Sequence, residues 1–201
     1  MRRFTNVMLN ISTSKGLSFV AMMAALGNVL SFISIQLSPI VPSIPLGPIS
    51  FSLALDLSHL ATFTASLLGG PIVGGLTGLV GGSVAAFQFG FSTGNLITGF
   101  ALPLGKAMTG VVAGVLFKRL GSGRLETLAV TVISYLPEAI FTAFLFVYLY
   151  PIVYGLPPAI ATVIAVQIIV KAFVEMLLIG AILAYIAGSK SFKAFTQPLT
   201  K

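Results

Sequence analysis

Six ionisable side chains lie inside stretches of the chain that are otherwise almost entirely apolar. They are Asp56, His59, Lys106, Glu138, Lys171 and Glu175. If these stretches cross a membrane, each group costs at least about 2.5 kcal/mol when it faces lipid, so the side chains must face the protein interior. Three carboxylates, two lysines and one histidine nearly balance in charge. Mutual pairing can therefore satisfy most of them, and contact with a polar ligand is the alternative.

Helix geometry limits which of these groups can meet. A rise of about 1.5 Å per residue from the expected helix ends puts both Lys106 and Glu138 at a depth of about 17 Å, near the bilayer centre, as plausible partners. Gln167, Lys171 and Glu175 follow one another at four-residue steps and share one helix face. Lys171 is expected either to pair with Glu175 or to contact a ligand together with Gln167. Glu175 itself is expected to be structural.

Asp56 and His59 are three residues apart, which predicts that they lie on nearly the same helix face in the outer half of the membrane. Asp56 is expected either to contact a ligand or to pair with Lys106 or Lys171. The sequence leaves these alternatives open.

The elements that must position these groups are membrane helices. The chain has 201 residues, of which 57% are hydrophobic and 7% charged, whereas about a quarter of the residues of a soluble domain are charged. A membrane helix needs about 20 apolar residues, so six such helices with short loops use up the chain. We expect an all-α membrane protein with one transmembrane domain, residues 1–201, and spans near 16–36, 51–70, 71–90, 95–117, 127–150 and 158–187.

Basic residues set the expected orientation. With six spans, the nine lysines and arginines outside them fall on one side, and the loops 37–50, 91–94 and 151–157 on the other side carry no charge. The positive-inside rule then predicts that both termini are cytoplasmic. The basic residues are too dispersed to indicate nucleic-acid binding, although the net charge is +7.

Two connections between the expected spans are informative. The first outer loop has four prolines between Pro39 and Pro48, which favours an extended, stiff segment. A lid and a plain connector are equally good interpretations of it. The sequence Gly69-Gly70-Pro71 predicts an abrupt reversal, so that the helices on either side form an antiparallel hairpin.

Glycines follow this turn at strict four-residue spacing: Gly70, Gly74, Gly78 and Gly82. Such glycines share one helix face and let a neighbouring backbone approach closely, so we favour a packing role over a sliding surface. Gly110 and Gly114 repeat the spacing once.

Prolines interrupt the fourth and fifth expected spans, at Pro103 and Pro137. Each removes a backbone hydrogen bond and can kink its helix. Kinks at these positions would open a cavity beside Lys106 and Glu138.

Catalytic and metal-binding motifs are not indicated. The chain has no Cys and one His, so neither a metal site nor a cofactor is expected. Residues 99–107 resemble a phosphate loop, but five residues separate its glycines and Ala107 follows Lys106 in place of Ser or Thr. No G-x-S-x-G motif is present either. The protein is therefore not expected to be an enzyme.

Several of these features together resemble a known family. Residues 55–60 read L-D-L-S-H-L and lead to L-L-G-G-P-I-V-G-G-L at 67–76, and Lys106 later precedes Gly110. With six expected spans, cytoplasmic termini and a proline-rich first outer loop, the chain resembles the substrate-binding S components of energy-coupling-factor (ECF) vitamin transporters. The likeness covers nearly all of the expected spans.

The resemblance implies a subunit of the cell membrane that captures a vitamin-like molecule on the outer side and docks on a transmembrane coupling protein driven by two ATPases. A riboflavin-like or other B vitamin is the first expectation, with pantothenate or folate next. Because the chain begins Met1-Arg2 and lacks the Met-His start of the nickel and cobalt branch, a metal cargo is not expected.

The resemblance also implies roles for particular residues. The family's A-x-x-x-A contact with the coupling protein matches Ala21 and Ala25. The family's outer ligand pocket points to His59, Asn95, Tyr148, Gln167 and Lys171.

The alternative function is a self-sufficient small channel or secondary carrier. Asp56, His59, Lys106 and Glu138 would relay protons through the bundle in that case. An intramembrane enzyme is a weaker third hypothesis.

Overall fold

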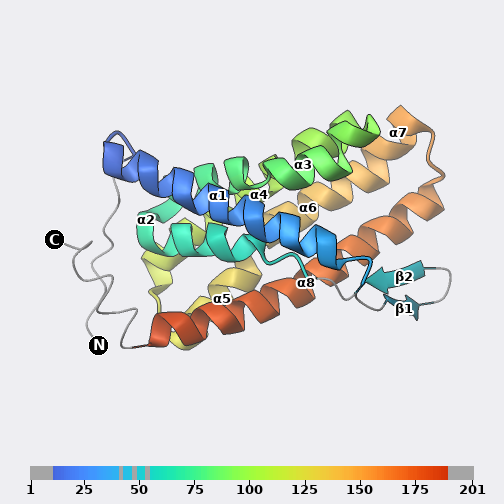
Figure 1. Cartoon of the computed structure of the whole chain (residues 1–201). Helices are drawn as coiled ribbons and strands as arrows, with labels where there is room; N and C mark the ends of the chain where they lie inside the picture. Colours follow the sequence, from blue (N-terminus) through green and yellow to red (C-terminus); the bar gives the residue numbers. More distant parts are fainter. Residues whose placement is uncertain (1–10, 41–42, 47–48, 53–54, 190–201) are drawn as a thin grey trace.

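The computed structural model describes residues 11–40, 43–46, 49–52 and 55–189. Its elements in chain order are α1 (Ser14–Leu37), β1 (Ser43–Leu46), β2 (Ile49–Ser52), α2 (Ser58–Gly81), α3 (Ser83–Phe89), a 3-10 turn (Phe91–Thr93), α4 (Leu96–Leu120), α5 (Arg124–Ser134), α6 (Leu136–Phe144), a π-helix (Leu145–Leu149), α7 (Tyr150–Tyr154) and α8 (Pro158–Gly188). The long helices lie side by side, and the antiparallel β1–β2 hairpin lies at one end of the bundle (Figure 1).

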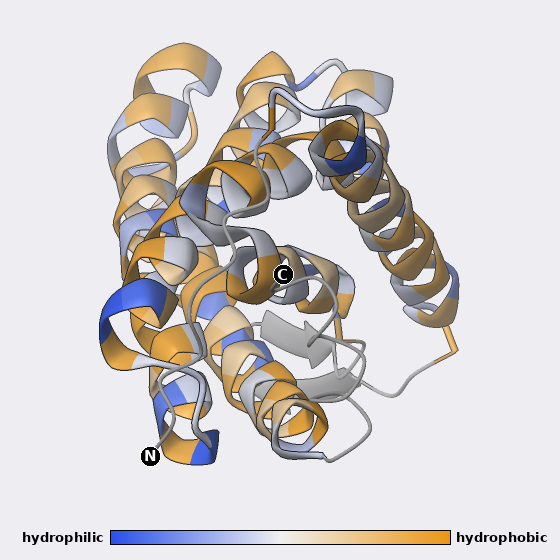
Figure 2. Cartoon of the chain, turned by 90° about the vertical axis from the view of Figure 1, so that its left-hand side faces the viewer, coloured by the Kyte–Doolittle hydropathy of each residue, from blue (hydrophilic) through white to orange (hydrophobic). Residues whose placement is uncertain are grey.

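Five helical stretches of the described chain are long and apolar enough to cross a membrane. They are Ser14–Leu37, Ser58–Thr93, Leu96–Leu120, Arg124–Tyr154 and Pro158–Gly188. Large apolar side chains such as Met22, Ile140 and Ile152 are exposed on the outside of the bundle, where the ribbons are largely hydrophobic (Figure 2). The prediction of a helical membrane protein is confirmed.

The 36-residue stretch Ser58–Thr93 folds back on itself at Gly70. Gly70 has φ +79° and ψ −167°, a backbone conformation that L side chains rarely adopt. A straight helix would separate Ser66 from Gly74 by about 12 Å, yet a Cβ on Gly74 would overlap the Ser66 hydroxyl. The reversal predicted at Gly69-Gly70-Pro71 is therefore confirmed.

The two ends of the bundle differ in charge. α1 begins, α8 ends and α4 connects to α5 at the same end of the bundle (Figure 1). The described basic residues outside the bundle interior gather here: Lys15, Lys118, Arg119 and Arg124. We call this the basic end, and the opposite end, which carries β1 and β2, the hairpin end.

One expected boundary is wrong. The second span was expected near 51–70, but its helix begins only at Ser58, because residues 49–52 pair with 43–46 as a strand. Asp56 consequently precedes the helix instead of lying within it, and its Oδ1 accepts a hydrogen bond from the Ser58 N–H at 2.9 Å. The lid and connector interpretations of the proline-rich loop stay predictions, and residues 41, 42, 47 and 48 lie outside the described chain.

The glycine ladder packs against α4. A Cβ on Gly82 would lie 2.8 Å from Cα of Pro103, one on Gly74 would lie 2.7 Å from the Gly110 carbonyl oxygen, and one on Gly78 would overlap the Lys106 carbonyl. Ser66 also donates to the Gly110 carbonyl at 2.9 Å. The two backbones touch because the α2 side of the contact consists of glycines, so the predicted packing role is confirmed.

Gly78→Ala should destabilise the protein by about 1–3 kcal/mol, because the added methyl group meets backbone that cannot rotate away. Gly81→Ala is the matched control in the same helix, since its Cβ would lie 3.5 Å from the nearest atom, the Ala24 carbonyl oxygen. Thermal unfolding of both purified variants measures the difference. Equal melting temperatures would mean that α2 and α4 can separate without cost.

The fifth expected span, 127–150, is divided into several segments. α5 ends at Ser134 and α6 begins at Leu136, with Pro137 in its first turn, so the break predicted at Pro137 is present. Pro103 instead lies inside an uninterrupted α4. Beyond α6, the π-helix Leu145–Leu149 changes the rotation of the residues that follow it.

Candidate functional site

A cavity of about 510 Å³ lies among α2, α4, α6 and α8. This volume is within the range of small-molecule sites. All six ionisable residues singled out from the sequence line it: Asp56, His59, Lys106, Glu138, Lys171 and Glu175. The remaining wall is mainly apolar and aromatic, with rings from Phe89, Tyr135, Phe141, Phe146 and Tyr150. The cavity thus has a charged floor at mid-bundle, formed by these six residues, and an aromatic wall. Phe146 and Tyr150 form the part of this wall nearer the hairpin end.

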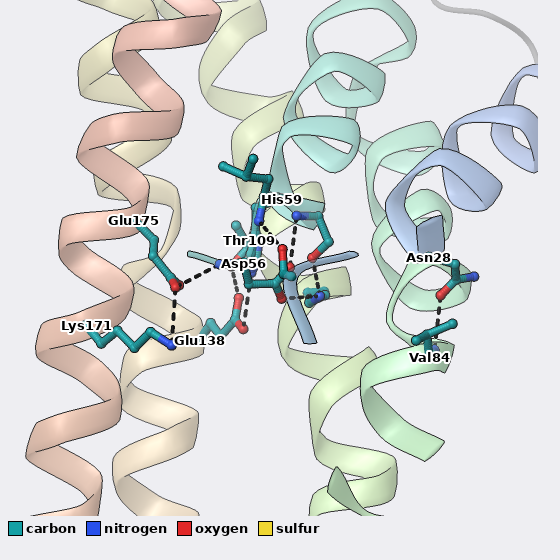
Figure 3. A network of polar contacts seen from close by, with 12 residues as sticks. Asn28, Asp56, His59, Val84, Thr109, Glu138, Lys171 and Glu175 are labelled. Atoms are coloured by element: carbon teal, nitrogen blue, oxygen red, sulfur yellow. Dashed lines mark hydrogen bonds and ion pairs between the residues drawn. The ribbon is translucent and has the colours of Figure 1, made fainter. Parts of the chain in front are cut away.

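Asp56 is the centre of the charged floor (Figure 3). Its Oδ2 lies 3.1 Å from Nζ of Lys106, and Lys106 is buried, with 3% of its surface exposed. Lys106 also donates to the Ser58 hydroxyl. The backbone N–H of Asp56 donates to Oε1 of Glu175 at 2.9 Å. Asp56, which precedes α2, therefore contacts both α4 and α8.

Glu138 occupies a different position from the one expected. The predicted pairing of Lys106 with Glu138 is wrong, because Lys106 pairs with Asp56 and Glu138 turns toward Thr109. The Thr109 hydroxyl donates to Oε2 of Glu138 at 2.5 Å. Oε1 lies 3.9 Å from Nε2 of His59, which is too long for a hydrogen bond. Gly105 makes room for this arrangement, since a Cβ there would lie 3.0 Å from Cγ of Glu138.

Lys171 belongs both to the ion-pair network and to the cavity wall. Its Nζ lies 3.7 Å from Oε1 of Glu175, as the i, i+4 spacing predicts, and 31% of its side-chain surface is exposed. Lys171 and Asp56 also line a second, smaller cavity of about 90 Å³ against the serines of α1. The pairing with Glu175 is confirmed, and contact of Lys171 with a ligand stays a prediction.

A polar cluster closes the wall toward the hairpin end. Asn95 caps α4, with its Oδ1 accepting from the Thr98 N–H at 3.0 Å and from the Tyr154 hydroxyl at 3.1 Å. Its amide donates to the Tyr150 hydroxyl at 2.7 Å, and Thr98 contacts the same hydroxyl. Tyr150 also stacks on Phe146, with ring centroids 4.4 Å apart. The cluster therefore fixes the start of α4 against the segment that follows the π-helix.

Of the five residues expected at a ligand pocket, the structure brings three to the cavity: His59, Asn95 and Lys171. Tyr148 and Gln167 are not among the residues that line it. Tyr148 is 62% exposed and packs beside Phe144.

The π-helix determines which aromatic side chains after α6 reach the cavity. In an uninterrupted α-helix the face that carries Glu138 and Thr142 would continue through residues 145, 146 and 149. The π-helix admits an extra residue into the turn, so Tyr150 lines the cavity in place of Leu149, together with Phe146. Sequence reasoning missed both aromatic residues, and the only available signal was the density of aromatic side chains between 141 and 154.

The alanines expected at a partner interface lie on the outside of α1. Ala21 and Ala25 are exposed, whereas Ala24 is 1% exposed and faces Gly81 in the bundle. The exposed alanines leave a shallow strip between large side chains such as Leu17 and Val29. This strip would let another helix approach closely.

The arrangement suits binding of a small molecule. Within the described residues no three His, Asp or Glu side chains are placed to hold a metal ion. Neither a protein-family model nor a curated protein matches the chain. The functional assignment therefore depends on the cavity and on the surfaces of the bundle.

Proposed function

We propose that this protein is the substrate-binding S component of an ECF-type importer. It captures a vitamin or related small molecule in the cavity, with a riboflavin-like or other B vitamin as the first candidate and pantothenate or folate next. It has no catalytic activity of its own. A transmembrane coupling protein and two ATPase subunits supply the energy for import across the cell membrane.

The observation that carries this proposal is the cavity. A volume of about 510 Å³ accommodates a molecule of vitamin size, and its aromatic wall suits a flat ring. Its polar groups are concentrated at the charged floor and at the Asn95–Tyr150 cluster, an arrangement that would fix the orientation of a bound molecule.

The proposed topology has six crossings with both termini in the cytoplasm. The fold-back at Gly70 supports this count, because it divides the Ser58–Thr93 stretch into two antiparallel arms. The gathering of Lys15, Lys118, Arg119 and Arg124 at one end supports a cytoplasmic basic end. The hairpin end, with the cavity nearby, then faces outward.

Single cysteines test this topology in a chain that has none of its own. We expect Ser43→Cys and Gly155→Cys to react with an impermeant thiol reagent in intact cells. Gly121→Cys and Ser189→Cys should react only after the membrane is opened. Labelling of Gly121→Cys from outside would contradict the six-crossing arrangement.

A self-sufficient carrier is the second candidate, favoured by the buried ionisable groups on α2, α4, α6 and α8. Uptake into liposomes separates the two functions. The import proposal expects uptake only when the coupling protein, ATPases and ATP are present. Uptake by the chain alone, driven by a proton or sodium gradient, would favour the carrier.

A further inference from the structure

The charges around the cavity do not balance. Asp56 pairs with Lys106 at 3.1 Å, and Glu175 pairs with Lys171 at 3.7 Å. These two pairs use both lysines of the cavity wall. Glu138 is the third carboxylate, and its nearest partners in the described chain are the Thr109 hydroxyl and the ring of His59.

Glu138 is nevertheless held in a defined position. It is 9% exposed, its Oε2 is fixed by Thr109, and Gly105 lets it lie against the backbone of α4. The second oxygen has no protein donor within hydrogen-bonding distance among the described residues, since His59 Nε2 is 3.9 Å away. Burying a carboxylate without a cation costs free energy. A bound ligand that carries a positive or hydrogen-bond-donating group would offset this cost by pairing with Glu138.

Aromatic rings flank this carboxylate on its own helix face. Tyr135 lies three residues before Glu138 and Phe141 three residues after it, and both line the cavity. Tyr135 is 2% exposed and is held edge-on by Phe173, with ring centroids 5.2 Å apart, so Phe141 is the more accessible of the two rings. Aromatic faces attract both flat heterocycles and cations.

We propose that the cargo is a heteroaromatic molecule whose amino or ammonium group donates to Glu138, with its ring beside Phe141. The inference rests on the proposed binding function and narrows its substrate class, because it favours an amine-bearing B vitamin over riboflavin. An acid at this position would place two negative groups together in a poorly solvated site. Amine-bearing rings are therefore preferred over carboxylates such as pantothenate.

The test measures binding of a matched series to the purified full-length chain by calorimetry. Pyridoxamine, pyridoxine and 4-pyridoxate share one ring and differ in an ammonium, a hydroxyl and a carboxylate substituent. Thiamine, riboflavin and pantothenate extend the series to larger cationic, neutral and anionic molecules. Any small molecule that co-purifies with the chain is identified by mass spectrometry.

We expect amine-bearing ligands to bind at least about tenfold more tightly than their neutral or acidic counterparts, as a charge-assisted hydrogen bond would give. Glu138→Gln keeps the side-chain shape and an acceptor for Thr109, and should remove this preference. Glu126→Gln is the matched control, because Glu126 is the remaining acidic residue of the chain and lies at the basic end. It should leave the preference unchanged.

Preferred binding of the acids, or a co-purified acid, would overturn the inference and leave the binding function standing. Unchanged ligand preference in Glu138→Gln with a lowered melting temperature would show that Glu138 serves only the fold. Failure of every ligand to bind, with no molecule co-purifying, would contradict both this inference and the binding function.

Discussion

Lys106→Met is expected to lower the free energy of unfolding by about 3–5 kcal/mol, because it leaves the Asp56 carboxylate without its cation inside the bundle. Lys106 is 3% exposed, and its ammonium group holds both Asp56 and Ser58. Asp56 in turn holds Glu175 through its backbone N–H. Thermal unfolding in detergent measures the loss.

The double variant Asp56→Asn, Lys106→Met should recover much of this stability. Both charges are then absent, and the amide that replaces the Asp56 carboxylate still has an oxygen for the Ser58 N–H. Lys15→Met, which removes an exposed lysine from the first turn of α1, is the control and should change stability little. A Lys106→Met variant as stable as the parent, or a double variant no better than the single one, would show that the buried pair does not hold the floor of the cavity together.

Under the import proposal, Ala25→Leu is expected to abolish import while ligand binding to the isolated chain stays intact. The side chain lies on the outer face of α1, so a larger residue would hold the coupling protein's helix away without touching the cavity. Ala21→Leu should act in the same way. Co-purification of the coupling protein and equilibrium binding of the cargo separate the two effects.

The neighbouring residue supplies the control. Ala24 is buried against the Gly81 backbone, so Ala24→Leu should lower the melting temperature and affect binding and import together. If Ala25→Leu lost ligand binding but still assembled with the coupling protein, the outer face of α1 would not be the docking surface.

Much of the architecture is predictable because segments that cross lipid must be apolar helices and their ionisable groups must face the protein interior. Apolar runs and their charged or glycine-rich ends locate the helices to within a few residues, as in α1 and α8. Gly70 is predictable as a turn because Gly-Gly-Pro favours one. The six ionisable groups are predictable as interior residues because exposure to lipid is costly, and all six do line one cavity.

The pairing of those groups is not predictable from spacing alone. Depth places Lys106 level with Glu138, but α2 begins only at Ser58 and leaves Asp56 in a non-helical segment that reaches Lys106. The π-helix after α6 rotates Tyr150 inward and leaves Tyr148 outside, and no residue in 145–149 indicates it. Both features depend on tertiary packing, which overrides local periodicity.

Native mass spectrometry of the chain, extracted gently from its own membrane, tests the import proposal most directly. We predict a complex that contains this chain, one further membrane protein and two ATPase subunits, with a small molecule retained by the chain. A chain recovered alone or only with copies of itself, and still competent for ion-driven uptake, would contradict the proposal.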